Sequence, residues 1–270
     1  MEVTNVLNPF SSLFKPSHLI LKNSTPFSVM ILSPHPDDES IVGSLGLRLQ
    51  KENNAHIINV AVTLGSKEER KLERTKELHE ACEVLDIENV ILHENWKIKE
   101  KELKSLIQKY QPQLIIAPHS KDFHPTHIKT SALAKKVLNS LKKETILVAW
   151  SEFWGQMTKP NILIEVPQEI LELQMNALTK HKGEIERNPY HLRLPAWMMD
   201  NVRRGSEIIG GKGMEAQTMA FGVLYQLQIS KRGKIQNLKL NDPFISSGIN
   251  IAQIFKLILD AASGSKTKVK

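Results

Sequence analysis

The chain has 270 residues, of which 41% are hydrophobic and 24% are charged, so it can bury a core of ordinary size and is not a disordered protein. Its 36 Lys and Arg residues outnumber 29 Asp and Glu, and the resulting net charge of +7 favours an anionic partner. The single cysteine, Cys82, excludes a disulfide framework and a cysteine-rich zinc site, so histidine and carboxylate groups must hold any metal.

The start of the chain has no basic segment followed by a long apolar run, which a secretory signal peptide needs. No stretch approaches the ~20 consecutive apolar residues that a membrane-spanning helix requires. We therefore expect a cytoplasmic protein without a transmembrane segment.

Short apolar runs alternate with helical patterns through the first 150 residues. The runs lack polar alternation, which predicts strands buried on both faces at residues 28–32, 56–62, 90–92, 114–117 and 146–150. Helical spacing predicts helices at residues 39–51, 68–85, around 103–110 and 128–141. Alternating strands and helices indicate βαβ units, so we expect an α/β fold, a Rossmann-like three-layer sandwich with a mostly parallel sheet.

The second half of the chain is less regular. Residues 162–166 predict a strand, and Pro167 suits the first turn of a helix that reaches about residue 185. A loop-rich stretch is expected at 187–213. Two further apolar segments flank residues 231–234, where Lys-Arg-Gly-Lys predicts the turn of a hairpin.

The end of the chain carries an amphipathic pattern at residues 249–262 and a basic tail at 266–270. We expect a main domain at residues 1–230 and a C-terminal extension at 231–270, with the hairpin and helix adding to the sandwich. Packing of the apolar helix face against the main body or a partner subunit is the ordinary interpretation, and contact with an anionic membrane surface is the alternative. A homo-oligomer stays open.

Ionisable residues gather directly after the first and the fourth predicted strands. Residues 35–39 read His-Pro-Asp-Asp-Glu, and residues 118–127 contain three histidines and Asp122. Because the carboxyl ends of parallel strands meet at one edge of a sheet, the two loops can converge. Histidine and carboxylate ligands suit zinc or another divalent transition ion, and three of them leave a position for water. The alternative is that the acids only stabilise the start of a helix and the histidines bind nothing.

The two loops resemble those of the PIG-L/LmbE-like N-acetylglucosaminyl deacetylases. Residues 35–39 look like the first motif of that family, and residues 124–127, His-Pro-Thr-His, are similar to its His-x-Asp-His motif. Further matches in the family's order are Thr63, Gly65, Arg74, Glu77, Ala81, Ala177, Leu178 and His181. The resemblance covers roughly residues 27–225.

The resemblance implies a metal-dependent hydrolase that removes an N-acetyl group from an amino sugar or a sugar conjugate. It places zinc, or another divalent transition metal, on His35, Asp38 and His127. Asp37 matches the general base that activates the attacking water, and His124 matches the residue that stabilises or protonates the tetrahedral intermediate. These roles agree with zinc chemistry, since the ion acidifies water and polarises a carbonyl, and a neighbouring carboxylate can carry the proton.

Three further positions follow from the same comparison. Arg74 matches an arginine that contacts the substrate. Thr126 stands where the family has an acid between the two histidines, so another group must orient and charge His124, and Asp122 is the candidate. Without such a group, His124 would titrate lower and be a weaker acid. Residues 181–184 also depart from the family, which puts substrate contacts from that segment in doubt.

Aromatic and charged residues outside these motifs have two interpretations each. Trp150, Glu152, Phe153 and Trp154 follow the fifth strand, where core or lid packing is favoured over stacking on a sugar ring. Arg203 and Arg204 are either anion ligands or part of a solvated helix face. The charged helix at 68–80 is expected to be exposed, and Cys82 to be a core residue.

Two other functions stay open on sequence grounds. One is a metal-dependent hydrolase of a different N-acyl compound. The other is a non-catalytic binding protein, but the first 150 residues show no basic stripe with interleaved aromatics, so we expect no nucleic-acid partner.

Overall fold

The computed structural model describes residues 27–263, so the basic tail at 266–270 lies outside the described residues. Five parallel strands form one half of the sheet in the order β3-β2-β1-β4-β5. They are β1 (Ser28–Ser33), β2 (His56–Ala61), β3 (Glu88–Ile91), β4 (Leu114–Pro118) and β5 (Thr145–Ser151). All five were predicted, which confirms the Rossmann-like core.

The other half of the sheet is mixed. Strand β7 (Gly222–Lys231) lies antiparallel between β5 and β6 (Ile162–Glu165), and β9 (Phe244–Ile245) runs parallel to β6. Strand β8 (Lys234–Asn237) pairs with β7 as the predicted hairpin. Arg232 and Gly233 both have positive φ at its tip, as a tight two-residue hairpin turn requires.

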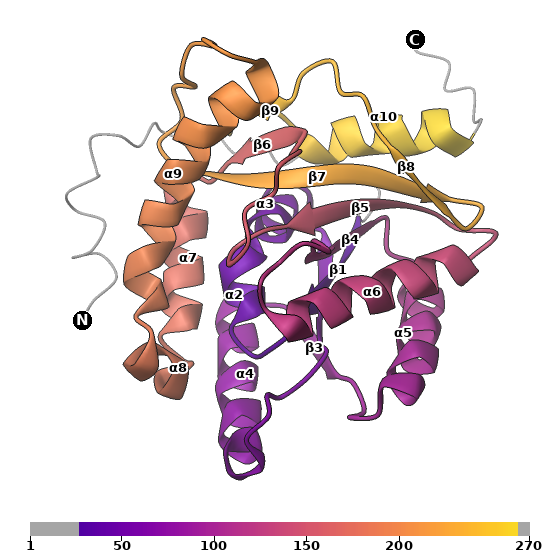
Figure 1. Ribbon diagram of the computed structural model, residues 1–270, viewed down its shortest axis with the longest axis vertical. Coiled ribbons are helices and arrows are strands. Elements are labelled where there is room, and N and C mark those ends of the chain that lie inside the picture. The colour runs from indigo at the N-terminus through magenta and orange to yellow at the C-terminus, as the bar shows by residue number, and fades with distance from the viewer. Residues whose placement is uncertain (1–26, 264–270) are drawn as a thin grey trace.

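Helices cover both faces of this sheet, which gives the three layers of the sandwich (Figure 1). One face carries α5 (Trp96–Tyr110) and α6 (Pro125–Ser140). The other carries α3 (Ser44–Asn53), α4 (Lys71–Leu85), α7 (Gln168–Leu178), α9 (Tyr190–Gly210) and α10 (Ile251–Ser263). Strand β1 shows why the apolar runs lack alternation: Val29 and Ile31 pack on this second face, while Met30 and Leu32 pack on the first.

Two predicted helices are each divided in the structure. The segment at 39–51 forms α2 (Asp38–Val42) and α3, with Gly43 between them. The segment at 167–185 forms α7 and α8 (Lys182–Arg187), with His181 at the break. Both breaks lie next to the candidate site, where the chain turns to place polar side chains.

The prediction of a loop-rich stretch at 187–213 was wrong, because α9 occupies most of it. Tyr190, Leu194, Met198 and Val202 recur at four-residue spacing and are buried. Pro195 lies inside the helix and, with neighbouring polar residues, disguised this apolar stripe.

Helix α10 packs against the main body through Ile251, Ala252 and Phe255, which are buried. The Phe255 ring lies 6.4 Å from that of Phe27, while Leu257 is half exposed. The apolar face is therefore covered in part by this chain, and the division at residue 230 stays a prediction. None of the helices within residues 27–263 has the length and apolarity to cross a membrane.

Candidate active site

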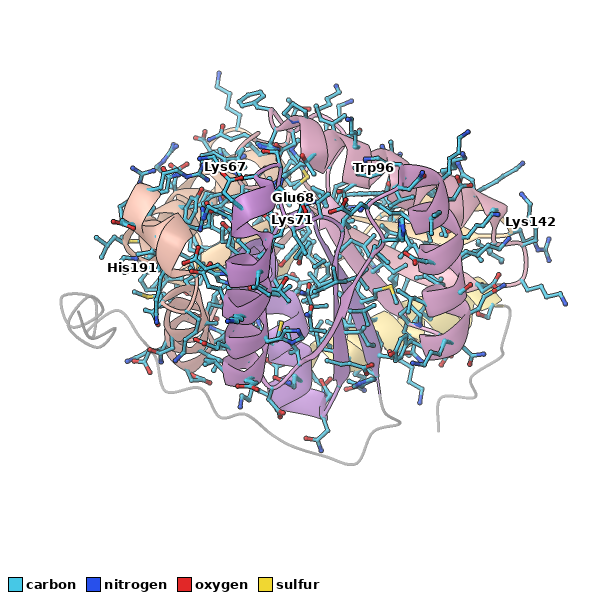
Figure 2. The ribbon with its side chains drawn as sticks, turned by 90° about the horizontal axis from the view of Figure 1, so that it is seen from below. Lys67, Glu68, Lys71, Trp96, Lys142 and His191 are labelled. Atoms are coloured by element: carbon cyan, nitrogen blue, oxygen red, sulfur yellow. The ribbon has the colours of Figure 1, made fainter. Side chains whose placement is uncertain are left out.

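The site lies at the carboxyl ends of β1 and β4, where the two predicted loops meet. They line a cavity of about 580 Å³ together with Arg74 from α4. Figure 2 shows Lys71 and Trp96, from the amino-terminal ends of α4 and α5, at this same end of the sheet. Of the sequence-predicted residues, His35, Asp37, Asp38, Arg74, His124, Thr126 and His127 all line the cavity, and Asp122 lies directly behind it.

Asp38 lies between two histidines. One of its carboxylate oxygens is 3.4 Å from Nδ1 of His35 and 3.5 Å from Nε2 of His127. Ligand atoms around a tetrahedral zinc ion, each about 2.0–2.1 Å from the metal, are about 3.3 Å apart. Ring nitrogens of His35, His124 and His127 also lie within 4.8 Å of one another. The donor set therefore fits a divalent transition ion. His35, Asp38, His124 and His127 are four candidate ligands, and a catalytic ion needs three of them.

The negative charge of Asp38 is stabilised by the neighbouring histidines. Burial alone would raise the pKa of Asp38, but the neighbouring His127 and His35 lower it to about 2. Burial likewise opposes the charged form of His127, while Asp38 and Asp122 raise its pKa. The carboxylate is thus held ionised, the form that binds a metal.

Asp122 supports His127 and not the ring of His124. One carboxylate oxygen accepts the backbone N–H of His124 at 2.8 Å, and the other lies 3.5 Å from Nδ1 of His127. Burial would raise the pKa of Asp122, but the contact with His127 holds it below its usual range. A carboxylate behind the second nitrogen of a histidine is the common outer support of a metal ligand.

His124 is the N-cap of α6, which begins three residues earlier than predicted because Pro125 occupies its first turn. Its Nδ1 accepts the backbone N–H of Thr126 at 3.3 Å, so a single ring proton belongs on Nε2. Burial and then the charge of His35 lower the pKa of His124. Asp38 and Asp122 act in the opposite direction, so the effect of the missing acid at position 126 stays a prediction.

Asp37 has φ of +118°, a backbone conformation that L-residues rarely adopt. Asp37 occupies the N-cap position of α2, and Asp38 and Glu39 lie in its first turn, as the alternative interpretation expected, but the Asp37 side chain makes no capping hydrogen bond. Its backbone N–H donates to Glu39 at 3.0 Å. Burial, and then the charge of Asp38, raise the pKa of Asp37 well above its usual value. A strained, buried acid beside the candidate metal ligands is typical of a functional group.

Glu39 and His181 fix the backbone beneath Asp37. The Nε2 atom of His181, at the α7–α8 break, donates to one Glu39 oxygen at 2.7 Å, and Ser40 Oγ donates to the same oxygen. Burial would raise the pKa of Glu39, but His181 lowers it. Sequence reasoning gave this pair no role, although both residues stood in matched motifs.

Helix α4 is exposed along one face, as expected, but two of its charged residues are buried and one of them, Arg74, lines the cavity. Arg74 and Glu77 are buried, and Arg74 Nη2 donates to the carbonyl of Pro36 at 2.9 Å. Glu184 from α8 lies 3.8 Å from Arg74 and also pairs with Arg70 and Arg187. The segment that departs from the family thus reaches the cavity, and sequence reasoning missed Glu184.

The residues after β5 divide between core and cavity. Trp150 is buried in the core, and Glu152 pairs with Arg204 of α9. Trp154 is 42% exposed and lines the cavity. Arg203 pairs with Asp200 on the exposed face of α9, as the solvated-face interpretation expects.

Comparison with known proteins agrees with this geometry. The PIG-L family, described as GlcNAc-PI de-N-acetylase, matches residues 30–138, which contain both loops. The chain is 25% identical to the probable N-acetyl-alpha-D-glucosaminyl L-malate deacetylase 2 of Bacillus subtilis (strain 168), over 58% of this chain and 83% of that protein. The resemblance to the PIG-L/LmbE-like family is therefore confirmed.

Solved structures share the fold. The N,N'-diacetylchitobiose deacetylase of Pyrococcus horikoshii superimposes with a TM-score of 0.59 at 18% identity, over 84% of this chain and 92% of that one. The 4-carboxy-2-hydroxymuconate hydratase of Pseudomonas putida KT2440 gives 0.58 at 15% identity, over 74% and 95%. Because these two proteins carry out different reactions, the fold alone does not define the chemistry, and the site must.

Proposed function

We propose that the protein is a zinc-dependent hydrolase that removes an N-acetyl group from an amino sugar or a sugar conjugate. The observation that carries the proposal is the juxtaposition of a strained, buried Asp37 with the donor set of His35, Asp38 and His127. The family match and the deacetylase names of the relatives favour the same reaction. Another divalent transition metal remains the alternative to zinc.

Each residue has a role in the proposed reaction. His35, Asp38 and His127 would hold the ion, which supplies a Lewis acid for the amide carbonyl and lowers the pKa of a water molecule. Asp37, which lies next to Asp38 and lines the cavity, takes the proton of the attacking water and delivers it to the leaving amine. His124, with its proton on Nε2, donates to the oxygen that becomes negative.

The wall of the cavity suits a sugar. Trp154, Trp96 and Tyr190 provide aromatic surface, and Arg74 has an Nε that is buried without a hydrogen-bond partner among the described residues. We assign Arg74 to substrate contact on this basis. We also propose that the protein is located in the cytoplasm and that it forms a homo-oligomer.

Asp37→Asn tests the reaction. Asparagine tolerates positive φ, so the backbone at this position can be kept. Release of amine from N-acetyl amino sugars is expected to fall by at least about 100-fold, because the general base is lost. Metal content measured by elemental analysis should stay unchanged. Full activity of this variant would exclude Asp37 as the base.

A panel of substrates separates the proposed reaction from hydrolysis of a different N-acyl compound. Acetylated amino sugars should be cleaved in preference to acetylated amino acids and simple acylamides. Preference for a compound without a sugar would favour the alternative.

A further inference from the structure

A second cavity, of about 260 Å³, lies outside the candidate active site and shares no lining residue with it. Its wall is formed by α6, β5, β7 and the loops that follow β4 and β5. It is therefore a separate place on the molecule, built on rigid elements of the sheet.

The cavity carries uncompensated positive charge. Lys121, Lys135 and Lys159 line it, and none of its described lining residues is acidic. Within residues 27–263, none of these three lysines has a carboxylate at ion-pair distance. Three ammonium groups around a small cavity, without a counter-charge, favour an anion there.

Lys135 is the best-defined of the three. It is half-buried on α6, and its Nζ lies 5.1 Å from the centroid of the Trp150 ring, which forms part of the cavity wall. Burial lowers the pKa of Lys135, and no neighbouring charge offsets this cost. An ammonium group that is held at a cavity wall, with no acidic side chain beside it, is suited to bind an anionic ligand.

Neutral polar side chains complete the wall, and one of them has a donor that is free within the described residues. Trp150 Nε1 donates to Gln228 at 2.6 Å, and the Gln228 amide donates to Asn237, which fixes this side of the cavity. The Gln226 amide makes no hydrogen bond with the described part of the chain and is available to a ligand. Lysines combined with amide donors are typical partners of phosphate oxygens.

The opposite wall is also fixed in place. His119 is buried, and its Nε2 atom is 2.7 Å from the carbonyl oxygen of Gly155. This hydrogen bond connects the loop after β4 to the loop after β5. Little rearrangement is needed for a ligand to enter, which reduces the entropic cost of binding.

We propose that this cavity binds a compact oxyanion, either inorganic phosphate or the phosphate group of a small metabolite, with Lys135 as its central cation. The cavity is of a size for a compact ligand, and its three lysines more than offset the two negative charges of a phosphate dianion.

Titration calorimetry with inorganic phosphate tests the proposal, and glycerol 3-phosphate as a second probe distinguishes a free phosphate from a phosphate ester. Lys135→Met keeps the aliphatic stem on Trp150 and removes the charge. Lys136→Met is the matched control, because it removes one positive charge from the next position on α6, where Lys136 pairs with Glu100. Lys159→Met, on the exposed loop, is a second variant that does not depend on packing in α6.

We expect the dissociation constant for phosphate to rise at least about fivefold in Lys135→Met and in Lys159→Met, as expected for a lost charge-assisted hydrogen bond. It should change less than about twofold in Lys136→Met, because a surface charge has a small effect. Equal affinities for all four proteins would overturn the proposal, since phosphate would then bind elsewhere, for instance at the metal. Absence of saturable binding to the wild-type protein up to ~10 mM phosphate would also overturn it.

Discussion

His181 Nε2 and the carboxylate of Glu39 lie 2.7 Å apart, and neither side chain is exposed at all. The pair connects the break between α7 and α8 to the loop after β1. The second oxygen of Glu39 accepts the N–H of Asp37, whose backbone is strained. A contact between residues 142 positions apart therefore helps to fix the conformation of the proposed base.

We predict that His181→Leu lowers the free energy of unfolding by about 3 kcal/mol, because it leaves the buried Glu39 carboxylate without one of its donors. Glu39→Gln is the informative comparison. The glutamine side-chain oxygen can still accept the N–H of Asp37, and its amino group can donate to Nε2 of His181. The ring proton of His181 can then move to Nδ1, which has no partner among the described residues. Urea denaturation should show a smaller loss for Glu39→Gln; an equal or larger loss would contradict this account.

The four candidate metal ligands can be separated by their effects on metal content. We predict that Asp38→Ala and His127→Ala remove bound metal, whereas His124→Ala retains it and loses turnover. Elemental analysis of the purified variants measures the first effect, and amine release measures the second.

The reverse result has an equally clear meaning. Loss of metal in His124→Ala, with retention in Asp38→Ala, would assign the ion to the three histidines, whose ring nitrogens lie within 4.8 Å of one another. His79→Ala is a suitable control, because this histidine lies on α4 and does not line the active-site cavity.

Asp122→Asn is predicted to weaken metal binding about 10- to 100-fold, because it removes the charge behind Nδ1 of His127 while keeping a similar shape. The metal dissociation constant can be measured by competition with a chelator. Thr126→Ser, which preserves the backbone N–H that His124 accepts, should leave that constant unchanged. An unaltered constant in Asp122→Asn would show that the carboxylate does not support the ligand.

Glu184 makes stability dependent on pH. Burial would raise its pKa, but Arg74, Arg187 and Arg70 hold it below the usual range. A carboxyl whose folded pKa is depressed stabilises the protein above its unfolded pKa, which is about 4.3, and loses that contribution as the pH falls. The difference in unfolding free energy between wild type and Glu184→Gln should therefore be largest near neutral pH and shrink below pH ~4.

The same comparison at exposed Glu186, also on α8, provides the control. Glu186→Gln should show little difference from wild type at either pH, since surface charges contribute little to stability. A pH-independent effect of Glu184→Gln would mean that its ion pairs do not contribute to folding.

The sequence was most informative for the strands. Met30 and Ile31 belong to an apolar run buried on both faces, which only a sheet between two helical layers can accommodate. Helix α9 was missed because Pro195 is a strong local signal, whereas the burial of Leu194 and Met198 depends on packing partners far away in the sequence.

For the site, the predicted residues do converge, because strand order determines which loops meet. What sequence spacing does not encode is the direction of side chains. Asp122 was expected to orient the ring of His124 but supports His127, and Glu184 was not recognised because its partners Arg70 and Arg74 lie far away in the sequence. Both outcomes depend on tertiary contacts between separate elements.

The antiparallel insertion of β7 has a consequence for synthesis of the chain. Until residues 222–231 leave the ribosome, β5 has no neighbour on one side, and its seven residues form an open, apolar strand edge. Fragments that contain β5 but end before β7 are therefore expected to self-associate instead of remaining as folded monomers. A fragment meant to fold as a monomer should therefore extend through β7.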